Sequence, residues 1–348
     1  MNELELKLHE SYIQRCFDLA RRSGKHVKSN PQVGSVIVYQ DRIIGEGAHQ
    51  RYGQAHAEVN AFKSVLNEDS HLLAKATIYV SLEPCYHTGK TGPCAQAIVD
   101  HGVKRVIISA IDPDPRVAGQ SISFLKSRGV EVIEGICKSE GEALIRPFVI
   151  NQQESRPYVM LKFAQSYDHF MGRPNESVWI SNSFSKILTH QWRSEVDAIL
   201  IGVNTLLVDN PLLTTRLVKG EHPLPVIIDP SLRSNWTSAI FQTDLKPIVF
   251  SSVAREHDQV NIIQIDFEAD PVVQILEYLY HEQDVCRLLV EGGRKTIDEF
   301  LSEGLWDLAC IFTAKHQLRS GIKAPSVSGV RIHDQLIEND QLHCIFRT

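Results

Sequence analysis

Three side chains that can bind zinc constrain this chain more than any other feature, because its fold has to bring them together. They are His56, Cys85 and Cys94, which offer one imidazole nitrogen and two sulfurs. Ligands of this kind suit zinc, and a set of three leaves one position of a tetrahedral ion open for water. Glu58 lies two residues from the histidine, where a carboxylate is placed to move protons rather than to bind metal. The sequence therefore predicts a zinc site with an acid–base group beside it.

The order of these residues is the pattern of zinc deaminases that act on nucleobases: His-x-Glu, then Pro-Cys, then a second Cys. Eight residues separate Cys85 from Cys94, whereas that pattern has two. In such enzymes hydroxide formed at the zinc attacks a ring carbon that carries an exocyclic amine. Glu58 would take the water proton, deliver it to the ring nitrogen and later protonate the departing ammonia. The alternative is a closed structural zinc site, for which His87 is the obvious fourth ligand.

Strands alternate with helices in both halves of the chain, a pattern typical of βαβ crossovers and a mostly parallel sheet covered on both faces. In the first half we expect helices at 8–23, 57–66, 95–101 and 119–127, and strands at 33–39, 43–47, 77–82, 105–111 and 130–134. In the second half we expect strands at 158–163, 198–202, 224–228, 247–250 and 287–290, and helices at 183–192 and 296–303. Pro147 and Pro157 bracket the expected boundary, which gives domains 1–147 and 148–348. The final thirty residues are the least patterned part of the chain.

Composition narrows the classes of function. A chain of 348 residues is long for one domain, and 43% hydrophobic with 22% charged residues is ordinary for a globular protein with a full core. No apolar run approaches the roughly eighteen residues of a membrane span, so we expect no membrane partner. A net charge of −6 and an aromatic content of 7% do not favour nucleic-acid binding. Seven scattered cysteines and an acidic N-terminus without an apolar stretch predict a reducing, cytoplasmic location.

Two blocks of sequence contain motifs that are specific to one family. The first block consists of Asn30-Pro31-x-Val33-Gly34, His56-Ala57-Glu58 and Glu83-Pro84-Cys85-x-His87-x-Gly89-x-Thr91-x-Pro93-Cys94. The second consists of Ile201-Gly202-Val203-Asn204-Thr205, Asp209-Asn210-Pro211-x-Leu213-Thr214-x-Arg216 and Glu291-Gly292-Gly293. With these blocks the chain resembles the bifunctional deaminase–reductase family of riboflavin biosynthesis. The resemblance runs from about residue 8 to about residue 310, and the long loop between the cysteines is typical of this family. It implies an α/β protein with a cytidine-deaminase-like three-layer α/β/α domain followed by a dihydrofolate-reductase-like α/β domain.

The resemblance also implies two consecutive reactions and their site residues. The first domain would deaminate 2,5-diamino-6-(5-phosphoribosylamino)pyrimidin-4(3H)-one, with one Zn²⁺ held by His56, Cys85 and Cys94 and with Glu58 as proton shuttle. The second would use NADPH to reduce the ribosyl group of 5-amino-6-(5-phosphoribosylamino)uracil to ribityl. The implied substrate contacts of the reductase are Ser177, Arg193, Leu213, Arg216 and Glu291. The implied cofactor contacts are Gln165, Trp179, Thr205, Asp209 and the stretch from Gly293.

Several of these residues also have a physical interpretation of their own. Arg193 and Arg216 carry guanidinium groups suited to a substrate phosphate, although surface salt bridges are the plain alternative. Asn30 precedes a proline and either contacts a sugar hydroxyl or belongs to a simple turn. Lys162 and Asp168 lie near the end of the first strand of the second half, where α/β sheets commonly bind ligands.

Other details qualify the resemblance. Gly292-Gly293 permits close approach of the backbone to a cofactor phosphate at a helix N-terminus, but it is not a Rossmann fingerprint. The chain departs from the family at His169, where glycine is usual.

Two rival functions remain open at this point. A nucleic-acid-editing zinc deaminase with an accessory domain would not respond to NADPH, whereas a reductase would be stabilised by it. A non-catalytic, zinc-stabilised ligand-binding protein would release no ammonia from any aminopyrimidine. For the bifunctional enzyme we expect a small phosphoribosylaminopyrimidine as partner, no nucleic acid, and a homo-oligomer, either a dimer or a tetramer.

Overall fold

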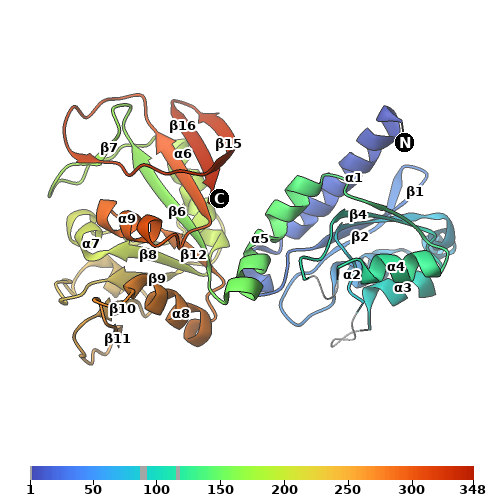
Figure 1. The fold of residues 1–348 in the computed structure, drawn as a ribbon, viewed down its shortest axis with the longest axis horizontal. Coiled ribbons are helices and arrows are strands. Elements are labelled where there is room, and N and C mark those ends of the chain that lie inside the picture. Colours follow the sequence, from blue (N-terminus) through green and yellow to red (C-terminus); the bar gives the residue numbers. More distant parts are fainter. Residues whose placement is uncertain (1, 87–91, 115–117) are drawn as a thin grey trace. The chain divides into compact units, whose positions relative to one another are not determined.

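The computed structural model describes residues 2–86, 92–114 and 118–348, and the chain divides into two compact units, Met1–Gln153 and Glu154–Thr348. The expected boundary at 147/148 falls inside a helix, α5 (Lys138–Glu154), which includes Pro147 and continues to the junction of the units (Figure 1). In the described part of the chain, no helix combines the length and the apolar character that crossing a membrane requires.

The first unit is built on a five-stranded sheet in the order β2-β1-β3-β4-β5. Its strands are β1 (Gly34–Tyr39), β2 (Arg42–Ala48), β3 (Thr77–Leu82), β4 (Arg105–Ala110) and β5 (Glu131–Glu134). The expected parallel pairing is confirmed for β3, β4 and β5, but β1 is antiparallel to both β2 and β3. A tight turn at Gln40 and Asp41, with φ angles of 48° and 60°, joins β1 and β2 as a hairpin and accounts for their antiparallel pairing.

Helices cover both faces of this sheet, so the three-layer α/β/α arrangement is confirmed. One face carries α1 (Glu3–Arg21) and α5, and the other carries α2 (Ala57–Ser64), α3 (Cys94–Asp100) and α4 (Gln120–Ser127) (Figure 1). Phe17 of α1 packs with Tyr79 and Ile107 on the first face, whereas Phe62 of α2 packs with Ile78 on the second. Two 3₁₀ segments, Gly24–Val27 and Asn67–Lys75, complete the connections.

The second unit contains a nine-stranded sheet in the order β11-β10-β9-β8-β12-β6-β13-β16-β15. The strands are β6 (Tyr158–Gln165), β8 (Ala198–Gly202), β9 (Leu224–Ile228), β10 (Ile248–Ser251), β11 (Asn261–Gln264), β12 (Arg287–Val290), β13 (Leu308–Thr313), β15 (Val330–Ile337) and β16 (Asp340–Phe346). From β11 to β13, each strand is parallel to its neighbours in the sheet. β16 is antiparallel to β13, and β15 is antiparallel to β16. This unit is therefore the mainly parallel α/β domain that the sequence predicts.

The helices of the second unit also form two outer layers. Hydrophobic residues of α6 (Ser183–Glu195) and α7 (Val203–Asp209) pack on one face of the sheet. Those of α8 (Pro271–Gln283) and α9 (Arg294–Ser302) pack on the other face (Figure 1). A short 3₁₀ segment, Ala239–Gln242, and a small sheet of β7 (Phe170–Gly172) and β14 (Ile322–Lys323) complete the unit.

Residues 330–346 form a hairpin that the sequence did not predict, with a register shift between Arg331 and His333. β13 pairs along its whole length with residues 341–346 of β16, and β15 adds to β16 as the edge of the sheet. β15 is exposed at every position except its last residue, so the apolar side chains of Val330, Ile332 and Leu336 do not belong to the core. The order of β15 comes from backbone pairing with β16 rather than from burial.

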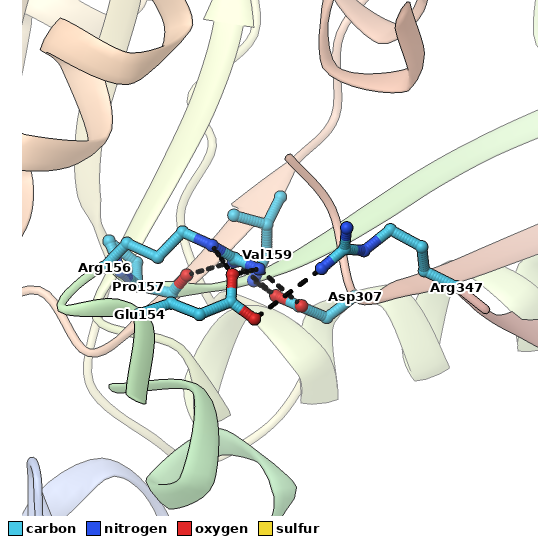
Figure 2. Close-up of polar contacts among 6 residues, drawn as sticks. All are labelled: Glu154, Arg156, Pro157, Val159, Asp307 and Arg347. Atoms are coloured by element: carbon cyan, nitrogen blue, oxygen red, sulfur yellow. Dashed lines mark hydrogen bonds and ion pairs between the residues drawn. The ribbon is translucent and has the colours of Figure 1, made fainter. Parts of the chain in front are cut away.

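A buried ion pair fixes the start of the second unit. The guanidinium of Arg156 donates to both carboxylate oxygens of Asp307 at 2.7 and 2.8 Å, and the backbone N–H of Val159 donates to the same carboxylate at 2.8 Å (Figure 2). Glu154 accepts from Arg156 at 2.7 Å and lies 3.7 Å from Arg347. The side chains of Arg156 and Asp307 are only 6% and 1% exposed. The cluster thus ties together the chain just before β6, just before β13 and just after β16.

We expect Asp307→Ala to destabilise the second unit by about 3 kcal/mol or more, because it leaves a buried guanidinium without its main partner. All four tryptophans lie in this unit, so urea unfolding followed by tryptophan fluorescence reports on it alone. Asp298→Ala, which breaks the exposed ion pair between Arg294 and Asp298, is the matched control and should cost less than about 1 kcal/mol. Equal midpoints for the two variants would contradict the role given to the cluster.

Candidate active sites

The predicted zinc ligands converge in the first unit. His56 is the N-cap of α2, Cys94 is the first residue of α3, and Cys85 follows the end of β3. The Nδ1 atom of His56 lies 3.4 Å from the Cys85 sulfur and 3.3 Å from the Cys94 sulfur. A nitrogen and a sulfur bound to one tetrahedral zinc ion at usual lengths are about 3.6 Å apart. The three donors therefore fit a single zinc ion.

Two further observations support this fit. Hydrogen bonding from Cys94 and from His56 lowers the pKa of Cys85 to about 4, which favours the thiolate that zinc requires. Among the residues that the structure describes, only these three form a group with metal-ligand geometry. His87, the fourth ligand of the alternative closed site, lies outside the described residues.

Glu58 lies beside the zinc ligands without joining them. It is the second residue of α2, is almost fully buried, and makes a side-chain hydrogen bond with Cys94. Burial, and then the nearby charge of Cys85, raise the pKa of Glu58 to about 7. A carboxyl group with such a pKa can both accept and donate a proton near neutral pH, which is what an acid–base shuttle requires.

Asn30 is oriented by a histidine that the sequence did not single out as functional. The side-chain amide of Asn30 donates to Nε2 of His49 at 3.0 Å, and Nδ1 of His49 donates to the carbonyl of Ala55 at 3.1 Å. Because a carbonyl can only accept, His49 is the tautomer with its proton on Nδ1, and Nε2 is free to accept. The buried His49 ring also packs edge-on against His56, with 5.6 Å between centroids. Asn30 is thereby held close to the zinc ligands.

Glu83, two residues before the first zinc cysteine, organises the segment that follows β4. Its carboxylate accepts from the backbone N–H groups of Asp112, Gly119 and Ser121 at 3.3, 3.0 and 3.2 Å, and from the Ser121 hydroxyl at 2.7 Å. Four donors on one buried carboxylate fix Asp112, Gly119 and Ser121 firmly relative to β3. The Glu-Pro-Cys motif therefore combines an anchoring carboxylate with a candidate metal ligand.

In the second unit, two predicted substrate contacts bind each other. The guanidinium of Arg193 donates to both oxygens of Glu291 at 2.8 and 3.0 Å, and the amino group of Lys162 lies 3.6 Å from the same carboxylate. Although burial opposes ionisation, the charges of Arg193 and Lys162 hold the pKa of Glu291 at about 2. Burial lowers the pKa of Lys162. Arg193 thus already has a carboxylate partner.

Other predicted reductase residues form two further contacts. The hydroxyl of Ser177 donates to Asp209 at 2.6 Å, which joins an implied substrate contact to an implied cofactor contact. Gly293 is the N-cap of α9, and a Cβ atom there would lie 3.3 Å from the Thr205 hydroxyl. A Cβ at Gly292 would meet Thr296 at 2.6 Å, so this turn has to be glycine for α9 to pack closely.

The loop after α7 depends on a second buried histidine. The backbone N–H of Arg216 donates to Nδ1 of His190 at 3.2 Å, while its side chain is exposed. Burial and the charges of Arg193 and Arg216 lower the pKa of His190 to about 4, so it is a neutral acceptor at pH 7. Leu213 in the same loop is buried and has a φ of 55°.

Two predicted cofactor contacts lie apart from these clusters. Trp179 is exposed, with the amino group of Lys186 4.4 Å from its ring centroid. Gln165 ends β6 and donates to the hydroxyl of Thr313 at 3.0 Å.

Asp168, expected near a ligand, instead supports a turn. It accepts from the Ser166 hydroxyl at 2.6 Å and from the backbone N–H groups of Leu318 and Arg319 at 3.0 and 2.7 Å. The following residue, His169, has a φ of 62°, so it adopts the left-handed conformation that the glycine usual at this position would adopt easily.

Comparisons with known proteins agree with both halves of this description. Residues 6–110 match the cytidine and deoxycytidylate deaminase zinc-binding region, and residues 157–316 match the RibD C-terminal domain. Riboflavin biosynthesis protein RibD of Aquifex aeolicus is 33% identical over 91% of this chain and 89% of its own length. RibD of Bacillus amyloliquefaciens is 34% identical over 92% of this chain and 88% of its own length.

Solved structures resemble the chain along its length. The diaminohydroxyphosphoribosylaminopyrimidine deaminase/5-amino-6-(5-phosphoribosylamino)uracil reductase of Thermotoga maritima has a TM-score of 0.86 and 32% identity, covering 99% of this chain and all of the other. RibD of Acinetobacter baumannii has a TM-score of 0.81 and 30% identity, covering 99% of both chains. With these relatives matching both α/β units over most of their length, the chain belongs to the RibD family of riboflavin-biosynthesis proteins.

Proposed function

We propose that the chain is a bifunctional enzyme that first deaminates 2,5-diamino-6-(5-phosphoribosylamino)pyrimidin-4(3H)-one and then reduces the ribosyl group of the product. The observation that carries the first step is the placement of the buried Glu58 beside three converging zinc donors. Zinc, when bound by His56, Cys85 and Cys94, supplies a water of lowered pKa at neutral pH. The site belongs to the first unit, and the deaminase domain that we propose, residues 1–147, ends within α5.

In this proposal, Glu58 transfers protons during deamination and Asn30 binds the substrate. Glu58 accepts a proton from the attacking water, delivers it to the ring nitrogen and then protonates the departing amine. Its burial supports this role, since the neutral and ionised forms are then of similar energy near pH 7. Asn30, whose amide is fixed by His49, is placed to hold a polar group of the substrate.

For the second step we propose an NADPH-dependent reductase in residues 148–348. NADPH, when bound, supplies a hydride. The N-terminus of α9 at Gly293 is suited to a cofactor phosphate because it exposes backbone N–H groups and carries partial positive charge. Thr205 packs against this turn, and Gln165, Trp179 and Asp209 are the further cofactor contacts that we propose.

The charges of the second unit suggest how the substrate is held. Glu291 already occupies the fork of Arg193, so the exposed guanidinium of Arg216 is the better group for the substrate phosphate. Lys162 is a buried cation that can stabilise negative charge on the sugar oxygen during reduction. Ser177 and Leu213 complete the proposed substrate contacts.

We further propose a homo-oligomer in the cytoplasm. The edge strand β15 leaves its outer backbone groups unpaired and exposes Val330, Ile332 and Leu336, which favours association with another copy. All seven cysteines are free thiols, as expected in a reducing compartment.

The decisive experiment incubates the purified protein with the diaminopyrimidinone, with and without NADPH, and follows ammonia and nicotinamide absorbance together. We expect ammonia in both cases and NADPH oxidation only after ammonia release. If ammonia is released without NADPH oxidation, only the deaminase activity is supported. If ammonia is not released and NADPH is not oxidised, the proposal is refuted.

We expect Glu58→Gln to slow ammonia release by about 10²-fold or more, the usual contribution of a general acid–base. Zinc content and NADPH oxidation with the already deaminated substrate should stay unchanged, because Gln keeps the shape of the side chain. Exposed Glu68→Gln is the control. Loss of zinc from Glu58→Gln, measured by elemental analysis, would make Glu58 a metal ligand instead.

We expect Arg216→Ala to raise the KM of the reductase for its phosphorylated substrate by about tenfold, the value of one charge-assisted hydrogen bond. The KM for the dephosphorylated analogue should not change, since that molecule lacks the group bound. Steady-state kinetics with both substrates measure the difference, and exposed Arg255→Ala is the control. An equal rise for both substrates would exclude a phosphate contact.

A further inference from the structure

Two thiols of the second unit face each other across neighbouring strands. Cys310 of β13 and Cys344 of β16 are direct partners in the antiparallel register, and their sulfurs are 3.2 Å apart. Directly opposed antiparallel residues have Cα atoms about 4.5–5.5 Å apart, which lies within the range that a disulfide spans. The backbone therefore already has the geometry of a cross-strand disulfide, and only the sulfurs have to close.

The two thiols differ in a way that assigns them different chemical roles. Cys310 is 1% exposed and lies on an inner strand, whereas Cys344 is 7% exposed and lies one strand from the edge of the sheet. The contact between the two sulfurs, and then burial, raise the pKa of Cys310, and the same contact lowers the pKa of Cys344. Because Cys344 is the more exposed thiol and lies nearer the edge of the sheet, an external disulfide reaches it first, and Cys310 is placed to attack second.

We propose that Cys310 and Cys344 are a reversible disulfide-forming site, oxidised by low-molecular-weight disulfides. The Cys344 thiolate attacks the external disulfide, forms a mixed disulfide and releases one external thiol. Cys310 then loses its proton and attacks the Cys344 sulfur, which releases the second external thiol. Two protein thiols become one disulfide, and the external disulfide takes up the two electrons.

This site is separate from the zinc thiols and lies next to the proposed reductase site. Cys310 is also the register partner of Lys162 on β6, and the amino group of Lys162 lies 5.8 Å from the ring centroid of Phe312. The bond would join the hairpin of β15 and β16 covalently to the inner strand β13. It would therefore hold the C-terminal hairpin in place when the rest of the unit begins to unfold.

The test uses the full-length, zinc-loaded protein equilibrated with oxidised glutathione, followed by alkylation of free thiols, digestion and mass spectrometry. We expect one linked pair of peptides, containing Cys310 and Cys344, that disappears on treatment with dithiothreitol. Zinc content should not change. In urea, the oxidised protein should show a higher midpoint of the tryptophan fluorescence transition than the reduced protein, because the bond restricts the unfolded chain.

Cys344→Ala and Cys310→Ala should abolish both the linked peptides and the shift in midpoint, and Cys286→Ala, a change at another buried cysteine, should abolish neither. The reduced midpoint of each variant shows whether it is folded. Separate alkylation of Cys310 and Cys344 after equilibration would overturn the proposal. So would a Cys344–glutathione adduct that Cys310 never resolves.

Discussion

The parallel pairing of neighbouring strands is the constraint on which both sites depend, because it brings the carboxyl ends of several strands to one edge of a sheet. In the first unit, Glu83 and Cys85 follow β3, beside its parallel neighbour β4. In the second, Glu291 follows β12, between the parallel strands β6 and β8. The helices that begin at these edges then contribute His56, Cys94 and Gly293. Residues far apart in sequence become neighbours through backbone pairing alone.

Within this frame, the surroundings of each carboxyl group decide its chemistry. Glu58 is buried beside the Cys85 sulfur, and burial raises its pKa to about 7. Glu291 is slightly more exposed and lies between Arg193 and Lys162, and their charges lower its pKa to about 2. The first carboxyl can exchange protons near neutrality, and the second is a permanent charge that orients its neighbours. The same side chain is thus suited to proton transfer in one unit and to positioning in the other.

Sequence patterns predicted what local rules determine and missed what depends on distant partners. Motif spacing predicted the zinc donors and the start of the helices at His56 and Cys94. An apolar run predicted the strand Thr77–Leu82. The exposed strand β15 has no buried face, since its order comes from pairing with β16. α5 was missed because Pro147 reads as a helix end, yet the helix continues through it.

The sites show the same limit. His49 and His190 gave no recognisable motif, because each acts through one hydrogen bond to a residue well separated in the sequence.

The ion pair between Arg193 and Glu291 has a further consequence for the selectivity of ligand binding. Lys162, Arg193 and Glu291 together carry a net charge of only one, so this cluster by itself attracts free inorganic anions weakly. Inorganic phosphate would therefore compete mainly for the exposed guanidinium of Arg216, and the cluster itself would be left to the uncharged parts of a ligand.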